Sequence, residues 1–523
     1  MEATSKLAES IIFNLACELI SIKTFYPTKR RLSPDKTIGS SKLWFTLVAA
    51  FFLSPWFANA ASESACRQLY AEVDRSIAQA GVRDAQETMI KGFPYLRTNR
   101  FLASLVSEAD TQEQFEFLLT QMIALDRHAR EIELSNLSAV QRPPVDRIAS
   151  EVAPDQPTLA AALQNCSQIL LAVDLAHTGA IKKNIHVPAR YSLMRRLFGL
   201  YPITAIPFAR GIRKFQAEMT QSYAKNLSDV IDKANVTVYA APPTSAIDVA
   251  KILGDASKNP LRIPLPTDEQ LAQLFARFAP NFAVDSKGEF DRPGAVTLGD
   301  DGRSRIDAES AKIYTLASHV KFAGQTLLQL NYTIWFSERP KKGTFDMLGG
   351  ALDGVMWRVT LAPNGEPLLY DTIHPCGCYH LFFPTAHLKA RPPHPSLQEH
   401  AYVPQTAPHL GAGERPTLWI ESATHYVVRV TNDLPAASAQ YEFADYDQLR
   451  SLAKNDGTRQ SLFRSDGLVK GSERGERVLF WPMGIASAGA MRQWGHHATA
   501  FVGMRHFDDA DLIDKAFEPA TSE

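Results

Sequence analysis

The spacing of apolar residues changes near the middle of this 523-residue chain. From residue 61 to about 235, apolar side chains recur every three or four positions, as in helices that bury one face. In the second half, residues 328–336 alternate between apolar and polar, as a strand with two different faces does. Helices and strands require different spacings of apolar residues, so a pattern that suits one does not suit the other. We therefore expect an α+β protein, with an N-terminal helical domain at 61–235 followed by a largely antiparallel, β-rich C-terminal domain at 306–510.

The segment between these halves, residues 236–305, is rich in Pro, Gly and Asp, and we interpret it as a connector. Thr267 and Gln270 have the spacing of a capping box and predict a short helix within it. In the β-rich half, the Asn364-Gly365 pair lies between two apolar runs and predicts a hairpin turn. Further strands are expected at 417–420, 426–430 and 478–481, and a polar tail at 511–523.

An export signal is predicted near the N-terminus. Basic residues precede an apolar run at 43–53, Pro55 follows it, and Ala58 and Ala60 are small residues that a signal peptidase accepts. The run is short for a membrane span. Residues 1–60 are therefore expected to be an N-terminal extension and secretory signal, cleaved near Ala60 to leave the mature protein in the periplasm or the medium. The alternative is an uncleaved signal anchor in the inner membrane.

Four cysteines follow the predicted cleavage point, and an even number is what disulfide pairing in an oxidising compartment requires. Cys66 and Cys166 each begin the apolar face of a predicted helix, with matching offsets to the apolar residues that follow. Two helices that pack through these faces would bring the thiols together. We therefore predict a Cys66–Cys166 disulfide, with two reduced core cysteines as the alternative.

Charge and hydropathy bear on the partners of the protein. Lys and Arg number 55 and Asp and Glu 56, so the chain has no positive excess for phosphates, and nucleic acid is not expected as a partner. The stretch 197–209 is apolar and has arginines on both sides. It predicts either a peripheral membrane contact or a buried corner between two helices.

Histidine is concentrated in the second half, where ten of the 14 histidines lie at or after His374. The densest point is the heptapeptide His-Pro-Cys-Gly-Cys-Tyr-His, which offers four soft or borderline metal ligands: His374, Cys376, Cys378 and His380. They predict a zinc or copper site if the loop turns sharply. Four other histidines are possible additional ligands: His425, His496, His497 and His506. Two alternatives remain, a disulfide between the neighbouring cysteines and a purely structural turn.

The motifs that the sequence lacks narrow the function. It contains no Gly-x-Ser-x-Gly, His-Glu-x-x-His, phosphate-binding Gly-Lys-Ser/Thr or Cys-x-x-Cys-His motif, which disfavours the common serine hydrolases, zincins, P-loop NTPases and c-type cytochromes. We expect an exported metal-binding protein, in which the metal would polarise a substrate or activate water if the protein is an enzyme. The alternative is a non-catalytic, disulfide-stabilised envelope protein that binds a small molecule or an envelope component, or acts as a scaffold.

Overall fold

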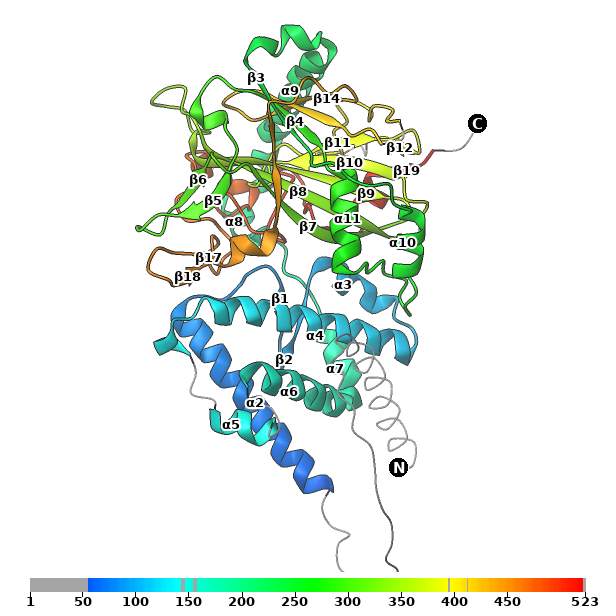
Figure 1. The fold of residues 1–523 in the computed structure, drawn as a ribbon, viewed down its shortest axis with the longest axis vertical. Coiled ribbons are helices and arrows are strands. Elements are labelled where there is room, and N and C mark those ends of the chain that lie inside the picture. The colour runs from blue at the N-terminus through cyan, green and yellow to red at the C-terminus, as the bar shows by residue number, and fades with distance from the viewer. Residues whose placement is uncertain (1–54, 143–145, 154–157, 394–395, 412, 521–523) are drawn as a thin grey trace, which may run out of the picture. The chain divides into compact units, whose positions relative to one another are not determined.

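The computed structural model describes residues 55–142, 146–153, 158–393, 396–411 and 413–520 of the chain (Figure 1). Helices and strands are both abundant among them, so the predicted mixed α+β class is confirmed. The chain divides into two compact units, residues 1–69 with 146–178 and residues 70–145 with 179–523. The division does not fall at the predicted boundary near residue 235, because helices from the first half pack with the strands of the second. The predicted apolar run of the export signal, 43–53, lies outside the described residues.

The first unit consists of helices joined by a disulfide. It contains α2 (Pro55–Ala80) as far as Leu69, α5 (Asp146–Val152) and α6 (Leu159–Asp174). Cys66 of α2 and Cys166 of α6 form the disulfide, with their Cα atoms 5.1 Å apart and both side chains fully buried. This is the pair that the two helical patterns predicted. The residue after Cys66, Arg67, forms an ion pair of 3.0 Å with Asp174, the last residue of α6.

One helical stretch of the described chain, Leu159–Asn184, is long and apolar enough to cross a membrane. The core helix of a soluble protein meets the same criterion. Here Cys166 and Leu170, on one face of α6, are fully buried within the protein.

The second unit begins with a short hairpin, β1 (Thr88–Ile90) and β2 (Phe93–Thr98), followed by α3 (Arg100–Ser104) and by α4 (Gln112–Ser135), which packs on β2. Three further helices are α7 (Thr178–Asn184), which enters this unit at Gly179, α8 (Leu193–Phe198) and α9 (Tyr201–Ala224), and α8 and α9 pack with elements of the second half of the chain. The fully buried Arg97 of β2 binds Asp126 at 3.0 Å and Glu133 at 2.7 Å, and both acids lie on α4. Because a buried guanidinium needs compensating charge, this pairing fixes α4 against the hairpin.

The largest sheet has six strands in the order β11-β10-β9-β8-β7-β16 (Figure 1). They are β7 (Lys312–Phe322), β8 (Gln325–Arg339), β9 (Gly350–Leu361), β10 (Pro367–Ile373), β11 (Leu381–Pro384) and β16 (Glu442–Asp445). All neighbours are antiparallel except β16 and β7. The predicted alternating strand is β8, and the predicted hairpin joins β9 to β10 through Gly365 at φ 86°.

A second sheet has five strands in the order β14-β13-β4-β3-β15. They are β3 (Val236–Ala240), β4 (Asn281–Asp285), β13 (Thr417–Ile420), β14 (Val427–Thr431) and β15 (Ala439–Gln440). One face of β8, including Tyr332 and Ile334, shares a core with Phe282 and Val284 of β4. The opposite face, including Trp335, packs on a separate core with Trp494 and Phe507.

The segment expected to be a connector is folded, and that interpretation was wrong. Residues 236–305 supply β3, β4, β5 (Ala295–Leu298), the start of β6 (Ser304–Asp307), α10 (Val249–Ala256) and α11 (Asp268–Phe278). The predicted capping box is present, with Thr267 and Gln270 bonded reciprocally at the start of α11. Every residue of β4 is buried, so this segment forms part of the core and is not an irregular connector.

Two further predictions at the C-terminal end were wrong. The strand expected at 478–481 is helical, as α12 (Arg477–Phe480) followed by the 3-10 turn η8 (Trp481–Met483). The expected polar tail forms α13 (Leu512–Ala516) and β19 (Phe517–Pro519), and β19 pairs with β12 (Leu388–Ala390). Its Ile513 and Phe517 side chains are fully buried, so this end of the chain belongs to the core.

The remaining described elements are short. They are β17 (Leu452–Ala453), β18 (Arg459–Gln460), η1 (Leu105–Ser107), η2 (Ala139–Gln141), η3 (Leu175–His177), η4 (Leu227–Asp229), η5 (Lys233–Asn235), η6 (Glu289–Asp291) and η7 (Tyr446–Arg450).

Candidate functional site

The Cys/His loop connects β10 to β11 through a tight turn. The Gly377 N–H donates to the carbonyl of His374 at 2.7 Å, and the His374 N–H donates to the carbonyl of Cys378 at 3.0 Å. Gly377 has φ 90°, and Tyr379 adopts φ 58°, which is costly for a residue with a side chain. The backbone therefore departs from extended geometry within this heptapeptide, and the side chains of neighbouring residues point in different directions.

The four predicted metal ligands do not converge on one point. His374 bonds through Nδ1 to Asp353 at 3.2 Å, whereas His380 bonds through Nε2 to a different carboxylate, Asp371, at 2.8 Å. Cys376 and Cys378 are free thiols, so the structure does not contain the alternative disulfide. Across the part of the chain that the structure describes, no group of three or more His, Cys, Asp or Glu side chains is arranged to hold a metal ion.

The additional histidines also lie in separate environments. His496 bonds to the carbonyl of Ala85 at 2.7 Å, and His506 bonds to Asp509 at 3.1 Å. His497 is buried, and burial lowers its pKa to about 3, so this imidazole is neutral. The predicted residues thus fit a metal ion poorly, and no step of the function proposed below is assigned to one.

Two of the predicted histidines meet at a buried carboxylate. Asp353, on β9, is 1% exposed and accepts hydrogen bonds from His374 at 3.2 Å and from His425 at 2.9 Å. The other ring nitrogen of His425 lies 3.4 Å from Asp291. These contacts form an Asp291–His425–Asp353–His374 chain within the protein, beneath the Cys/His loop.

Two opposing effects determine the ionisation states in this Asp–His network. Burial disfavours charged groups, whereas contact with a group of opposite charge favours them. Burial by itself would raise the pKa of Asp353, but the two imidazoles hold it well below its usual value. For His425, burial opposes the charged form, yet the nearby Asp291 carboxylate and the hydrogen bond to Asp353 leave its pKa raised. The network therefore favours an ionised Asp353 beside a protonated His425.

Backbone strain is concentrated around Asp353. Eight non-glycine residues of the described chain have positive φ, and four of them lie in the segments that build this network: Leu352, Tyr379, Ala423 and His425. Such conformations cost about 1–2 kcal/mol each and persist where the surroundings fix them, often at functional sites. The strain singles out this corner of the molecule.

A cavity of about 460 Å³ lies next to the network. Its walls come from α9, the loop 378–381, and residues of 399–402, 476–480 and 499–505. Tyr379 lines it and separates it from the network, since its ring lies 5.0 Å from the ring of His374 and 5.4 Å from that of Phe215. The volume is within the usual range of small-molecule sites. Cys378 and His380 of the predicted site thus belong to a cavity wall, with Tyr379 between them.

The apolar walls of the cavity contain a few polar groups. Glu476 is 5% exposed, and in the described chain its carboxyl group accepts no hydrogen bond. Burial raises its pKa from 4.5 to about 7, although nearby arginines oppose the shift. The pKa of the Cys378 thiol is raised well above its usual value by Cys376 and by burial, so this cysteine is not activated as a nucleophile. Glu476 is therefore the group best placed to exchange a proton near neutral pH.

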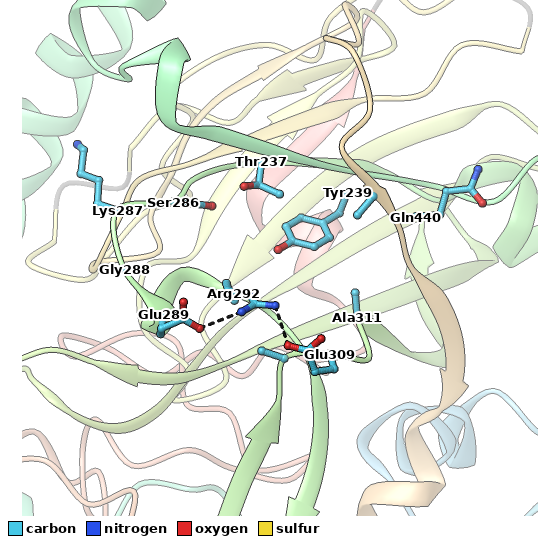
Figure 2. A pocket seen from close by; sticks show the side chains of 12 residues that line it. Thr237, Tyr239, Ser286, Lys287, Gly288, Glu289, Arg292, Glu309, Ala311 and Gln440 are labelled. Carbon is cyan, nitrogen blue, oxygen red and sulfur yellow. Dashed lines mark hydrogen bonds and ion pairs between the residues drawn. The ribbon is translucent and has the colours of Figure 1, made fainter.

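A second hollow of about 530 Å³ has a different character (Figure 2). It is an open depression beside β3, where Arg292 reaches both Glu289 and Glu309, at 3.0 and 3.1 Å. The two glutamates are more than four-fifths exposed. Solvent-exposed charges that already pair with each other give little binding energy, so the first cavity is the stronger candidate.

Comparisons of the chain with protein-family models, with curated proteins and with solved structures give no match. The candidate site therefore stands on geometry alone. The density of Cys and His predicted the loop that forms one wall of the cavity, but Asp353 and Glu476 were not predicted from the sequence. Asp353 could have been noticed in the sequence, because it is an acid beside an apolar run in a strand. Glu476 is one of several acids in a polar stretch, so the sequence does not distinguish it from the others.

Proposed function

We propose that this chain binds a small, largely apolar molecule in the cavity beside α9 and presents the Glu476 carboxyl to it. The observation that carries the proposal is the cavity itself, a space of about 460 Å³ with mainly apolar walls and a few polar groups. In such sites the apolar walls supply affinity and the polar groups orient the ligand.

The composition of the walls supports an apolar ligand. Phe208, Ile212 and Phe215 line the cavity from α9, and Phe480 and Phe501 line it from the C-terminal segments. Aromatic side chains offer large contact areas to a ligand. A carboxyl group with a pKa of about 7 is half neutral at physiological pH, so Glu476 can donate a hydrogen bond as well as accept one.

This proposal is closer to the binding-protein alternative of the sequence analysis than to the metal-binding expectation. It assigns no role to an ion: in the described chain no group of three or more His, Cys, Asp or Glu side chains is arranged to hold one. Export to the periplasm or the medium remains a separate proposal, as does an envelope component as the source of the ligand.

A substitution at the cavity rim tests the proposal. Gly211 lies within α9, lines the cavity and is exposed, and a Cβ added there would meet no atom within 4 Å. Gly211→Trp should therefore narrow the cavity without a clash with the fold. Gly254 on α10 also has open space around its Cβ but does not line the cavity, so Gly254→Trp is the matched control.

The measurement is equilibrium binding of the neutral apolar dye N-phenyl-1-naphthylamine to the full chain, with direct excitation of the dye. We expect one saturable site, with binding weakened about tenfold or more by Gly211→Trp, which corresponds to about 1.4 kcal/mol. Gly254→Trp should bind like the parent protein. Equal affinity in all three proteins, or no saturable binding, would refute the proposed function.

A further inference from the structure

Large apolar side chains are exposed mainly in one region of the second unit. Of the 17 that are exposed in the described chain, seven lie on α8 and the first half of α9 or between them, and three lie on α12 and η8. We call these ten residues the apolar face: Leu193, Met194, Leu197, Phe198, Leu200, Ile203, Ile206, Val478, Leu479 and Trp481.

The segments that carry the apolar face pack against one another. Gly199, between α8 and α9, approaches Pro482 of η8 so closely that a Cβ would lie 2.6 Å from its Cα. Arg196 of α8 donates to the carbonyl of Met483 at 2.9 Å, and the rings of Phe208 and Phe480 are 5.3 Å apart. The ten residues therefore belong to one packed assembly of short helices.

The inner side of this assembly is already filled. Ala205 and Ala209 of α9 are buried against Met483 and Val502, while Ile203 and Ile206 of the same helix point outward. Leu193 is 74% exposed and Phe198 is 71% exposed. The stretch 197–209 is thus a corner between two helices, as one interpretation of the sequence expected, but it is not a buried one.

Such a surface needs an apolar or interfacial environment to cover it. Soluble proteins rarely expose a contiguous apolar patch of several hundred Å² unless it binds something. The surrounding charge indicates the partner, since neither residues 191–217 nor residues 477–507 contain an Asp or Glu. Arg195, Arg210, Arg213 and Arg477 are exposed in these segments.

We infer that the apolar face docks on a phospholipid bilayer that contains anionic lipids. Leucine, isoleucine, phenylalanine and tryptophan side chains would enter the boundary between headgroups and acyl chains, and the arginines would lie at the phosphates. A short helical assembly whose own segments carry exposed arginines and no Asp or Glu suits this interface, whereas a protein partner would need an acidic rim of its own. The inference stands independently of the cavity proposal.

The apolar face and the cavity share structural elements. Phe208 and Phe480 line the cavity, and both belong to the elements that carry the apolar face. A molecule dissolved in the outer part of a bilayer would therefore meet the cavity wall close to the docked surface. This would give an amphiphile a short route between the two.

The test uses the full chain and vesicles of phosphatidylcholine with about one third phosphatidylglycerol, an anionic composition of the kind that attracts arginines. Leu197→Ser with Phe198→Ser should lower the vesicle partition coefficient at least about tenfold, since two apolar side chains no longer leave water. The matched control is Val140→Ser with Leu434→Ser, two exposed apolar residues outside the face. It should bind like the parent protein.

Two further measurements identify the surface and the lipid. Arg210→Gln with Arg213→Gln should weaken binding to the anionic vesicles about fivefold or more, and leave binding to pure phosphatidylcholine unchanged. Because the apolar run 43–53 could itself enter a bilayer, hydrogen exchange should show vesicle-dependent protection at 193–206.

Unchanged partition in the serine variant together with no protection there would overturn the inference. Concentration-dependent self-association that the serine variant abolishes, without vesicle binding, would instead assign the face to a second copy of the chain. If dye binding fails while vesicle binding persists, only the cavity proposal is lost.

Discussion

Glu476 is a carboxyl group that folding removes from water without giving it a hydrogen-bond donor. Arg474 and Arg339 attract its charge, but burial outweighs them and its pKa rises to about 7. Asp353 shows the opposite outcome at similar burial, because two imidazoles bond to it directly and lower its pKa. Imidazoles in direct contact, which act through both charge and hydrogen bonds, favour ionisation of Asp353, and among the described residues Glu476 has no such contact.

The raised pKa of Glu476 predicts a pH dependence of stability. Its folded pKa of about 7 exceeds the unfolded value of 4.5, so the stabilising contribution of its neutral form is complete below pH 4.5 and is lost as the pH rises through about 7. Glu476→Gln, which cannot ionise, should therefore be more stable than the parent by about 2–3 kcal/mol at about pH 9 and nearly equal at about pH 5. Urea unfolding across this range measures the difference.

The control for this experiment is Glu442→Gln, at an exposed glutamate on β16. Its profile should follow that of the parent protein. A Glu476→Gln profile parallel to the parent at every pH would contradict the assignment of a neutral buried carboxyl.

The Asp353 network predicts a second pH-dependent effect. Asp353→Asn leaves a protonated His425 without its closest counter-charge, so we expect a loss of roughly 3–5 kcal/mol in the free energy of unfolding. His425 has a raised folded pKa, so its contribution is present below pH 6.5 and is lost as the pH rises through the folded value. The loss in the variant should therefore be larger at about pH 6 than at about pH 8. Equal losses at both pH values would show that His425 is not charged in this network.

At the scale of single elements, the sequence predicted those that obey one clear periodicity. β8 alternates because its two faces pack on different surroundings, and the β9–β10 hairpin carries an Asn-Gly turn. β4 could not be recognised in this way, since all five of its residues are buried and no alternation exists. Residues 478–481 are apolar and short, which suits a strand as well as a helix, and only packing on α9 through η8 decides between them.

The candidate site was predictable only in part. The density of Cys and His marked the loop between β10 and β11, which does form a cavity wall through Cys378 and Tyr379. The partners of its histidines could not be read from the sequence, because Asp353 lies 21 residues from His374 and 72 from His425. Spacing along the chain suggested ligands around one ion, whereas the sheet register distributes His374 and His380 to different carboxylates.

The turn in the Cys/His loop predicts a strong requirement for glycine. Gly377 has φ 90°, and a Cβ there would lie 2.6 Å from the carbonyl oxygen of Ala498. Gly377→Ala should therefore lower the free energy of unfolding by about 2–4 kcal/mol, from backbone strain and from a clash with backbone that cannot move freely. It should also weaken dye binding, because Cys378 and Tyr379 would shift.

The control is Gly457→Ala. Gly457 has φ 79° but open space around its Cβ, so it carries the conformational cost without the clash. We expect a loss of only about 1 kcal/mol there. Equal losses at Gly377 and Gly457 in urea unfolding would show that the contact with Ala498 is unimportant.

At the scale of the whole molecule, the two units depend on different interactions. The second unit has several cores built on two sheets, and it contains the cavity and the apolar face. The described part of the first unit is a small group of helices, in which the Cys66–Cys166 disulfide joins positions 100 residues apart. Small units with little core often rely on such links, and disulfides persist in oxidising compartments. The predicted export would supply that environment, and cleavage near Ala60 would leave the part of α2 that carries Cys66 intact.

The last prediction follows from this division. Replacing both cysteines, Cys66→Ala with Cys166→Ala, should destabilise the first unit by about 4.7 kcal/mol, the loop-closure contribution for a loop of about a hundred residues. The second unit retains its own cores, so dye binding in the cavity should persist at temperatures where proteolysis already cleaves α6.

For the parent protein recovered from the periplasm, peptide mapping without reduction should show Cys66 joined to Cys166, and terminal sequencing should begin at Ala61. Free alkylation of both cysteines in the folded, exported protein would contradict the disulfide. An intact N-terminus on a membrane-bound form would contradict cleavage and support the signal anchor. Simultaneous loss of both units in the double variant would show that the first unit is required for the stability of the second.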